Sequence, residues 1–412
     1  MSGFKSAQTG DFDKYFMTTT DLIDRYAQGG LWMWGGNNAT GITAWGTLGD
    51  NTSTNRSSPV QTISKNNNWK QIACGFNHTA AIKTDGSLWL WGVNGTVIGG
   101  TGQLGDGTIV NKSSPVQTIA GGTNWKQVAC GQLYTAAIKT DGTLWCWGTG
   151  NNGQLGDSNN TSLRSSPVQT IAGGTNWKQV ACGGFHTAAI KTDGTLWTWG
   201  VGNVGQLGDS TTISGRSSPV QTIAAGTNWK QVSCGQYHTV AIKTDGSLWS
   251  FGFGGFGQLG DSNSTTVRSS PVQTIAAGTN WKQVACGQNH TAAIKTDGSL
   301  WLWGSGLNGQ LGDSTTITGR SSPVQTIAGG NNWKQVACNS AATAFNAPTA
   351  AIKTDGSLWT WGDNLVGELG DSTLSHRSSP IQTIAGGTNW KQVAVGGSFI
   401  GAVQNSDIGI IS

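Results

Sequence analysis

Short apolar segments alternate with polar turns along the chain, and the same pattern returns many times. Residues 280–304 read NWKQVACGQNHTAAIKTDGSLWLWG, in which WKQVAC and HTAAIK are apolar runs of strand length. The pair Asp297 and Gly298 is a strong signal for a tight hairpin turn. LWLWG then alternates, which places both of its tryptophans on one face, and the later RSSPVQTI contains a proline that an outer strand tolerates. The pattern predicts a unit of four short strands.

The unit recurs about every 52 residues, which is the signature of a propeller or a solenoid. Residues 29–36, GGLWMWGG, supply a third strand without the first two, and residues 389–407 supply the first two strands without a third. We therefore predict an all-β, seven-bladed β-propeller of four-stranded blades over residues 30–412, closed by pairing of the N- and C-terminal segments. Seven tryptophans mark the first strand of each unit: Trp69, Trp125, Trp177, Trp229, Trp281, Trp333 and Trp390.

Composition agrees with this architecture and excludes several others. The chain has 64 Gly and 21 Trp but only 11% charged residues, which fits many short strands joined by tight turns. A disordered chain would be poor in aromatic residues, and a helical one would not carry so much glycine. No apolar run approaches the roughly 18 residues that span a bilayer, so we expect no membrane insertion. The net charge of +4 is spread over the repeats, so no basic patch indicates nucleic-acid binding.

The residues that could carry chemistry occupy repeated slots, which favours structural roles. Six of the seven cysteines follow the repeated Trp by five residues, on equivalent strands that cannot bridge one another, so we interpret them as buried thiols in a reducing compartment. The repeated tryptophans are interpreted as core. No motif indicates a metal or a cofactor, and we predict that the protein is not an enzyme. One slot holds four histidines and once Tyr134, which indicates hydrogen-bonded structural residues rather than a catalytic base: His78, His186, His238 and His290.

The copies disagree with one another mainly in loops. Variation is concentrated after WG, after LGD, and before TAAIKTDG, where residues 339–348 read NSAATAFNAP. Loops of this kind sit at blade edges and can present side chains to a partner, although neutral drift in loops is an equal alternative. The apolar residues predicted to bind are Phe253, Phe256, Leu307, Phe345 and Val366.

Residues 1–29 lie outside the repeat and are predicted to form an anchoring arm. The stretch TTDLIDRYAQGG has the capping and spacing of one small helix, and aromatic residues precede it. The arm either packs on its own propeller or docks into another subunit, and we expect docking. The docking residues predicted for it are Phe4, Phe12, Tyr15, Phe16, Met17, Leu22, Ile23 and Tyr26.

The segment CGQNHTAAIKTDGSLWLWGSGLNGQLGD at residues 286–313 resembles the repeats of the regulator of chromosome condensation family. The resemblance covers the chain from about residue 30 onward and implies a seven-bladed propeller. It does not imply a single activity, because members of that family include a nucleotide exchanger, a secreted β-lactamase inhibitor and ubiquitin ligases.

The arm, MSGFKSAQTGDFDKYFMTTTDLIDRY, is similar to leader segments of bacteriophage virion structural proteins. The functional hypothesis is accordingly a non-enzymatic virion protein, as decoration, fibre or tail-associated component, located in a virion assembled in the host cytoplasm. Its arm would bind other virion proteins, and its loops a host surface protein or glycan. The alternative is a protein-binding regulator or inhibitor similar to the nucleotide exchanger or the β-lactamase inhibitor.

Overall fold

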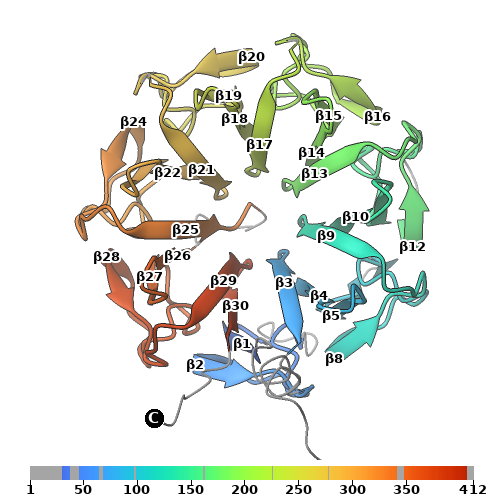
Figure 1. Ribbon diagram of the computed structural model, residues 1–412, viewed down its shortest axis with the longest axis horizontal. Helices are drawn as coiled ribbons and strands as arrows, with labels where there is room; N and C mark the ends of the chain where they lie inside the picture. Colours follow the sequence, from blue (N-terminus) through green and yellow to red (C-terminus); the bar gives the residue numbers. More distant parts are fainter. Residues whose placement is uncertain are drawn as a thin grey trace, which may run out of the picture.

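Seven four-stranded antiparallel sheets stand around a central axis in the computed structural model (Figure 1). The structure describes residues 30–37, 46–64, 68–96, 99–160, 163–224, 226–276, 278–340 and 348–405. Its described part contains strands and no helix, so it confirms the all-β propeller with seven four-stranded blades. It also holds no helix that is long and apolar enough to cross a membrane. The arm and its small helix lie outside the described residues.

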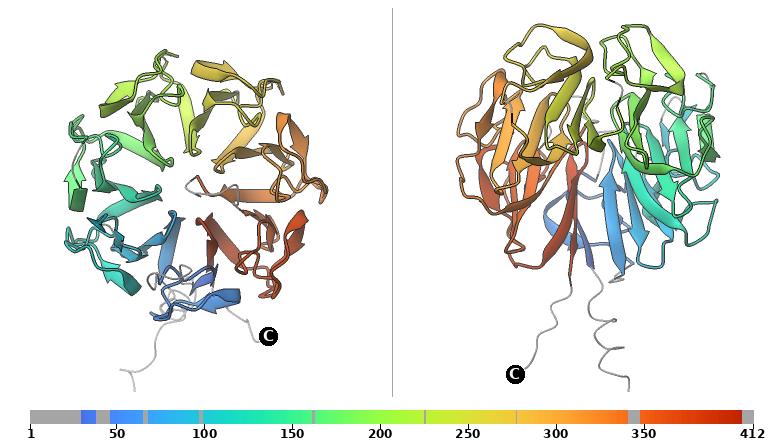
Figure 2. Two further views of the ribbon diagram at one scale, coloured as in Figure 1. Left: turned by 180° about the vertical axis from the view of Figure 1, so that it is seen from behind. Right: turned by 45° about the horizontal axis from the view of Figure 1, so that its top comes forward.

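The inner strand of each blade has the sequence WKQVAC or a close variant. Its first residue is buried and the following lysine is exposed, as the alternation of a strand requires. We number the blades 1 to 7 from the first of these strands. In that order the inner strands are β3 (Trp69–Cys74), β9 (Trp125–Cys130), β13 (Trp177–Cys182), β17 (Trp229–Cys234), β21 (Trp281–Cys286), β25 (Trp333–Cys338) and β29 (Trp390–Val395). They converge on the axis in the views from both sides (Figures 1 and 2).

The second and third strands of each blade form its buried middle. The second strands are β4 (His78–Lys83), β10 (Tyr134–Lys139), β14 (His186–Lys191), β18 (His238–Lys243), β22 (His290–Lys295), β26 (Thr349–Lys353) and β30 (Phe399–Gln404). The third strands are β5 (Leu88–Gly92), β11 (Leu144–Thr149), β15 (Leu196–Val201), β19 (Leu248–Phe253), β23 (Leu300–Gly304), β27 (Leu358–Gly362) and β1 (Gly30–Gly35).

The outer strands carry the RSSPVQ sequence and are only partly buried, which suits an edge strand that contains proline. They are β8 (Lys112–Gln117), β12 (Leu163–Gln169), β16 (Gly215–Gln221), β20 (Val267–Gln273), β24 (Arg320–Gln325), β28 (Arg377–Gln382) and β2 (Arg56–Gln61). A short ribbon of β6 (Gly95–Thr96) and β7 (Gly99–Gly100) adds to the loop of blade 1.

Blade 7 draws its strands from both ends of the chain, in the order β2-β1-β30-β29. Trp32 of β1 pairs with Ala402 of β30 in an antiparallel register that runs along the whole of both strands. The two ends of the repeat region therefore lie side by side in one sheet, and β29 of this blade lies against β3 of blade 1.

Adjacent blades are joined by a ring of glutamine side chains on the inner strands. Gln231 Nε2 donates to the carbonyl of Val284 at 3.3 Å, and its Oε1 accepts from the N–H of the same residue at 3.2 Å. The last member, Gln392, makes the same pair with Ile72 of blade 1, at 3.2 and 3.1 Å. The ring is therefore continuous through all seven interfaces. Its members are Gln71, Gln127, Gln179, Gln231, Gln283, Gln335 and Gln392.

The hydrophobic core lies between blades rather than within them. At the interface of blades 4 and 5, Trp281 and Trp303 pack with ring centroids 6.0 Å apart, and both are almost fully buried. Trp303 Nε1 donates to the carbonyl of Gln258 in blade 4 at 2.9 Å, so this buried indole also has a polar partner in the preceding blade. These positions confirm that the repeated tryptophans are structural.

Candidate functional site

Two kinds of loop emerge on the same face of the propeller. Within blade 5, Cys286 at the end of the inner strand pairs with Thr291, and His290 pairs with Gly304 at the end of the third strand. The turn between the first and second strands therefore lies beside the loop that follows the third strand. We call the surface that these turns and loops form the loop face.

A pocket of about 370 Å³ opens on the loop face around blade 4. Its walls come from three blades, because blade 4 supplies Gln236, Tyr237, Phe253 and Phe256, while blades 3 and 5 flank it. This volume is at the small end of the range for ligand sites, enough for one large side chain rather than an extended ligand. The flanking residues are Asn203 and Val204 of blade 3 and Gln288 and Asn289 of blade 5.

Aromatic rings form the apolar wall of the pocket. Phe253 and Phe256 meet edge to face, with ring centroids 6.1 Å apart, and both are half-buried. The Phe253 ring lies over Gly255, where an added Cβ would come within 2.3 Å of the ring, so the glycine makes this packing possible. Tyr237 stacks at 5.8 Å on Phe185 of blade 3, which continues the aromatic surface onto the neighbouring blade.

Amide groups form the polar rim. Gln288 Nε2 donates to Gln236 Oε1 at 2.9 Å and so ties blade 5 to blade 4 at the edge of the pocket. The backbone fixes the aromatic residues, because Phe253 N–H donates to the Tyr237 carbonyl at 2.8 Å and Phe256 N–H donates to Gln258 Oε1 at 2.9 Å. These bonds hold the wall in place before any ligand arrives.

The pocket lining carries no carboxylate, lysine or arginine. Its one titratable group is Tyr237, whose pKa is raised by burial, so the phenol stays neutral around neutral pH. An apolar wall with an uncharged amide rim can hold an uncharged group by burial and hydrogen bonds. The residues that line the pocket include no nucleophile beside a base.

The structure brings together two of the predicted binding residues, Phe253 and Phe256. Leu307 lies half-buried on the equivalent loop of blade 5 but does not line the pocket. Val366 packs toward blade 7, where its Cγ2 is 3.2 Å from the position of a Cβ on Gly36. Phe345 and the eight arm residues lie outside the described residues.

Sequence reasoning missed Tyr237, Gln236, Gln288 and Asn289. The signal was present, because the two positions before the histidine slot vary from copy to copy as strongly as the loop after WG. These positions become one site only when the turns of blades 4 and 5 are placed beside the Phe253 loop.

The repeated histidines are structural, as predicted. His238 Nε2 lies 3.1 Å from Thr291 Oγ1 of the next blade, and burial lowers the pKa of His238 to about 3, so its imidazole is neutral. Tyr134 replaces the histidine because its hydroxyl reaches Thr187 Oγ1 of the following blade, at 3.1 Å. In five blades the slot therefore holds a polar group that bridges two blades, whereas blades 6 and 7 have Pro348 and Phe399 there.

Six of the seven cysteines line the central channel, Cys146 lies in the core instead, and all seven are free thiols. Cys286 Sγ donates to the Ser233 carbonyl of the preceding blade at 3.5 Å, and burial raises the pKa of this thiol to about 12. Within the described ranges no group of three or more His, Cys, Asp or Glu residues has an arrangement that could hold a metal ion.

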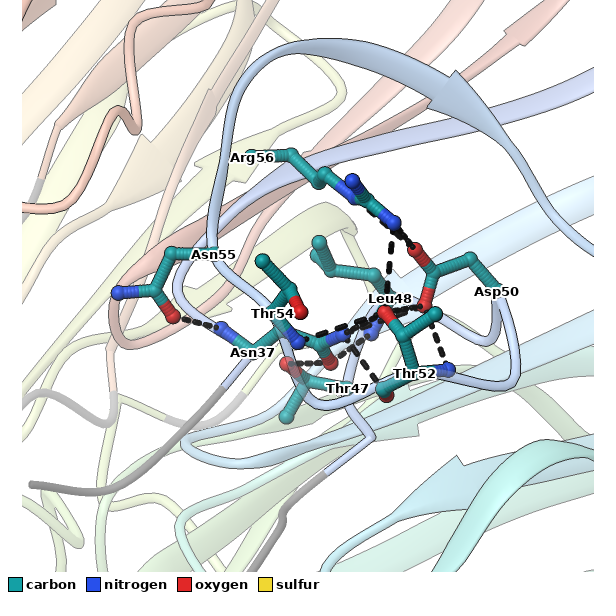
Figure 3. Close-up of polar contacts among 8 residues, drawn as sticks. All are labelled: Asn37, Thr47, Leu48, Asp50, Thr52, Thr54, Asn55 and Arg56. Carbon is teal, nitrogen blue, oxygen red and sulfur yellow. Dashed lines mark hydrogen bonds and ion pairs between the residues drawn. The ribbon is translucent and has the colours of Figure 1, made fainter.

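The GD aspartates organise the loops of their own blades, as the cluster around Asp50 shows (Figure 3). Arg56 donates to Asp50 Oδ2 at 3.1 and 2.9 Å, and Thr52 donates to Oδ1 through its N–H and its hydroxyl. Burial alone would raise the pKa of Asp50, but the hydrogen bonds from Thr52 and Arg56 outweigh it and lower the pKa. The buried amide of Asn37 donates to Asp50 at 3.2 Å and accepts from Leu48 N–H at 3.0 Å. These are turn-stabilising carboxylates.

Seven repeated four-stranded blades arranged around one axis define a repeat β-propeller. The chain belongs to the family of regulator of chromosome condensation (RCC1) repeats: the RCC1-like domain model matches residues 166–408, and the RCC1 repeat model matches residues 28–82, 85–138 and 141–190.

The chain is similar in sequence to a plant receptor and to a mammalian ubiquitin ligase. The chain is 36% identical over 251 residues to the ultraviolet-B receptor UVR8 of Arabidopsis thaliana, a match that covers 60% of this chain and 56% of the receptor. It is 30% identical over 330 residues to the E3 ubiquitin-protein ligase HERC2 of Mus musculus, covering 78% of this chain and 7% of the ligase. The match thus spans about half of the receptor and a small part of the ligase. RCC1-repeat propellers are mostly non-enzymatic regulators, and the ligase relatives carry other domains.

Solved structures confirm the fold. Yeast RCC1 (Prp20), crystallised with bound Kap60, superposes with a TM-score of 0.76 at 18% identity, covering 98% of this chain and 97% of that one. Human WBSCR16 superposes with a TM-score of 0.75 at 20% identity, and the match covers 91% of this chain and 99% of WBSCR16. At this identity the likeness shows the fold alone.

The comparisons contradict the prediction of a bacteriophage virion protein and its virion and host-surface partners. The relatives named above are RCC1-like proteins of a plant, of mammals and of yeast, and the likeness of the arm to phage leaders finds no support. The leader resemblance rested on about 26 residues without a specific motif, whereas the repeat extends over most of the chain. The virion location, which followed from that function alone, stays a prediction.

Proposed function

We propose that this chain is a protein-binding regulator or inhibitor whose loop face captures a partner protein, with the pocket of Phe253 and Phe256 as the anchor point. Residues 30–412 form the binding propeller in this proposal, and residues 1–29 precede it. The propeller acts by presenting a rigid surface rather than by carrying out a reaction.

The observation that carries the proposal is the aromatic pocket itself. A Phe, Tyr or Trp side chain buries about 150–250 Å² when enclosed, which at about 25 cal/mol/Å² gives several kcal/mol from a single inserted residue. Buried aromatic anchors in preformed pockets are where protein interfaces concentrate their binding energy. Because the rim offers amides and no charges, it suits the backbone and an apolar side chain of a partner.

The proposal is supported by what is known of proteins with the same fold. Yeast RCC1 (Prp20) has been crystallised with Kap60, and Prp20p from Saccharomyces cerevisiae has been characterised for binding to Gsp1p and histones. Propellers of this class therefore serve as protein-binding surfaces in at least these cases. The absence of charge in the pocket argues that an apolar segment, rather than a nucleic acid, is its ligand.

The test is to select peptides from a random displayed library on the immobilised protein and to measure their affinity by titration. We expect the selected peptides to share a Leu, Met, Phe or Trp residue. A loop-swap variant, Phe253→Ser with Gly255→Leu and Phe256→Asn, gives blade 4 the SGLNG loop that blade 5 already carries. Loss of a central anchor costs at least about 2 kcal/mol, so binding should weaken by about thirtyfold or more.

The matched control is Leu307→Ala, on the same face but outside the pocket. Binding should be unchanged in this variant. Peptides that bind the loop-swap variant as well as the parent, or that depend on charged residues, would show that the pocket is not the anchor.

A further inference from the structure

Blade 6 differs from its sister blades at three titratable positions on the loop face. Asp363 follows WG, where the other copies have Gly, Val, Thr, Phe or Ser. Glu368 stands where five other copies have Gln, and His376 precedes Arg377 where two sister blades have Asn55 and Asn111. Blade 6 therefore carries titratable side chains at positions where most sister blades have uncharged residues, which indicates a function specific to this blade.

The ring nitrogen of His376 has two partners that it cannot satisfy together. His376 Nδ1 lies 2.9 Å from Asp363 Oδ1 and 3.1 Å from the backbone nitrogen of Asn364. It accepts the Asn364 N–H only when it carries no proton, and it donates to the Asp363 carboxylate only when it does. The two short contacts therefore belong to two protonation states.

The sister blades contain the same contact without a titratable group. In blade 7, Asn37 N–H donates to Asn55 Oδ1 at 2.8 Å, and in blade 1, Asn94 N–H donates to Asn111 Oδ1 at 2.8 Å. An amide oxygen accepts at any pH, so those two loops are anchored permanently. In blade 6 the equivalent hydrogen bond is made by His376 and depends on the protonation of its ring nitrogen.

The buried side chain of Asn364 shows what the anchor holds. Its Nδ2 donates to Asp371 Oδ1 at 3.2 Å and to the carbonyls of Thr373 and Ser375 at 3.0 and 3.1 Å, which is the bonding that organises the loop from Asp371 to Arg377. The Asn364 backbone N–H needs an acceptor because the residue is fully buried. When His376 is protonated, that acceptor is lost.

In the described part of the chain, the ionisable groups around His376 include Asp363, Glu368, Asp371 and Arg377. The Asp363 side chain is 3% exposed; burial raises the pKa of this carboxyl and His376 opposes the rise, while Asn308 Nδ2 of blade 5 lies 3.4 Å from its Oδ1. Glu368 is buried beside it with a pKa raised by burial to about 7, and its Oε2 accepts from Val366 N–H at 2.9 Å. The remaining charged neighbours are Asp371 and Arg377, which pair with each other at 3.0 Å.

We propose that the blade 6 loop from Asp371 to Arg377 is held by a proton-operated latch, in which His376 Nδ1 exchanges the backbone N–H of Asn364 for the carboxylate of Asp363. The latch is closed when the imidazole is neutral with its proton on Nε2, and it is open when Nδ1 carries a proton. The loop carries Leu374, which is 60% exposed, and the preceding segment carries Leu365, which is 56% exposed. Opening therefore changes how an apolar part of the loop face is presented, and this holds whether or not the blade 4 pocket binds a partner.

Amide hydrogen exchange resolved by NMR tests the latch on the intact chain. Exchange is measured at pH 7.5 and at pH 5.5, so that the two protonation states of the imidazole can be compared. After correction for the intrinsic exchange rate, protection of the Asn364 amide should fall by about tenfold over that range. The amides of Asn37 and Asn94 in the same molecule are the internal controls, and their protection should change equally little.

Two variants taken from sister copies separate the latch from its neighbours. His376→Asn restores the anchor of blades 1 and 7, so protection of the Asn364 amide should become independent of pH. Glu368→Gln restores the residue of five other blades and should leave the pH response in place. Equal pH responses at Asn364 and Asn94 in the parent, or a tenfold fall that persists in His376→Asn, would overturn the proposal.

Discussion

The four buried histidines predict that acid unfolds this propeller well above the pH at which its carboxylates protonate. Burial lowers the pKa of His78, His186 and His238 to about 3 and that of His290 to about 4. In the unfolded chain the same groups titrate near pH 6.5. Because the folded-state pKa values are depressed, the unfolded state binds more protons below pH 6.5, and stability falls as the pH decreases through that value.

The size of the effect follows from the difference in proton binding. Between pH 7 and pH 5 each histidine lowers the free energy of unfolding by about 2 kcal/mol, and all four together lower it by about 7–8 kcal/mol. Glu368 opposes this, because its raised pKa of about 7 means that the folded state takes up a proton on acidification, which returns about 2 kcal/mol. The net loss of about 5 kcal/mol is comparable to the whole stability of many domains. Four of the GD aspartates have lowered pKa values and reduce the unfolding free energy only below about pH 4: Asp50, Asp209, Asp313 and Asp371.

Urea unfolding followed by tryptophan fluorescence at pH 7 and pH 5 measures this loss directly. The variant His238→Tyr removes one histidine and introduces the residue that Tyr134 already supplies in the same slot. Between pH 7 and pH 5 the free energy of unfolding of this variant should decrease by about 2 kcal/mol less than that of the parent, whatever the stability of the variant at pH 7. Equal losses in the two proteins, or a parent stability that does not change between pH 7 and pH 5, would refute the reasoning.

Three further substitutions test the packing that supports the loop face, each by urea or thermal unfolding. Gln231→Leu leaves the N–H and carbonyl of Val284 without their partners and should cost about 1–3 kcal/mol; a neutral effect would show that the glutamine ring is dispensable. Gly298→Ala should destabilise by more than about 1 kcal/mol, because φ is +82° and the new Cβ would meet the Asn331 carbonyl at 2.2 Å; unchanged unfolding would contradict the turn geometry. Lys112→Arg should replace a single 3.7 Å contact to an aspartate by the forked pairing of the other blades and should stabilise by less than about 1 kcal/mol, in a salt-dependent way; a loss would contradict it.

The architecture could be predicted because each structural position is written several times. Glycine in the Asp-Gly turn and tryptophan in LWxWG are present in almost every copy, so the turn and the core position could be predicted from the sequence. The glutamine ring was not predicted, because nothing in the strand sequence WKQVSC distinguishes Gln231 from its polar neighbours, and its partner is the backbone of the next blade, 53 residues away. A hydrogen bond to the backbone requires no particular residue at the partner position, so the sequence does not indicate it.

The candidate site was predicted in part for the same reason. Comparison of the copies identified Phe253 and Phe256 as variable loop residues. The comparison does not show which loops are neighbours in space, so it could not place these residues beside Tyr237 and Gln288. The latch was missed because His376 lies in a variable loop and reads as a solvated residue, whereas its partner Asp363 is buried. The arm had no repeated copy to compare, and the inference drawn from it was wrong.

The central claim is that a partner segment binds on the loop face at the blade 4 pocket. Hydrogen–deuterium exchange of the full chain, measured by mass spectrometry with and without a saturating selected peptide, tests it most directly. The account predicts new protection in the segments that contain residues 236–237, 253–256 and 288–289 and no change in the Asp-Gly turns on the opposite face. Protection confined to those turns or to the outer strands would contradict it.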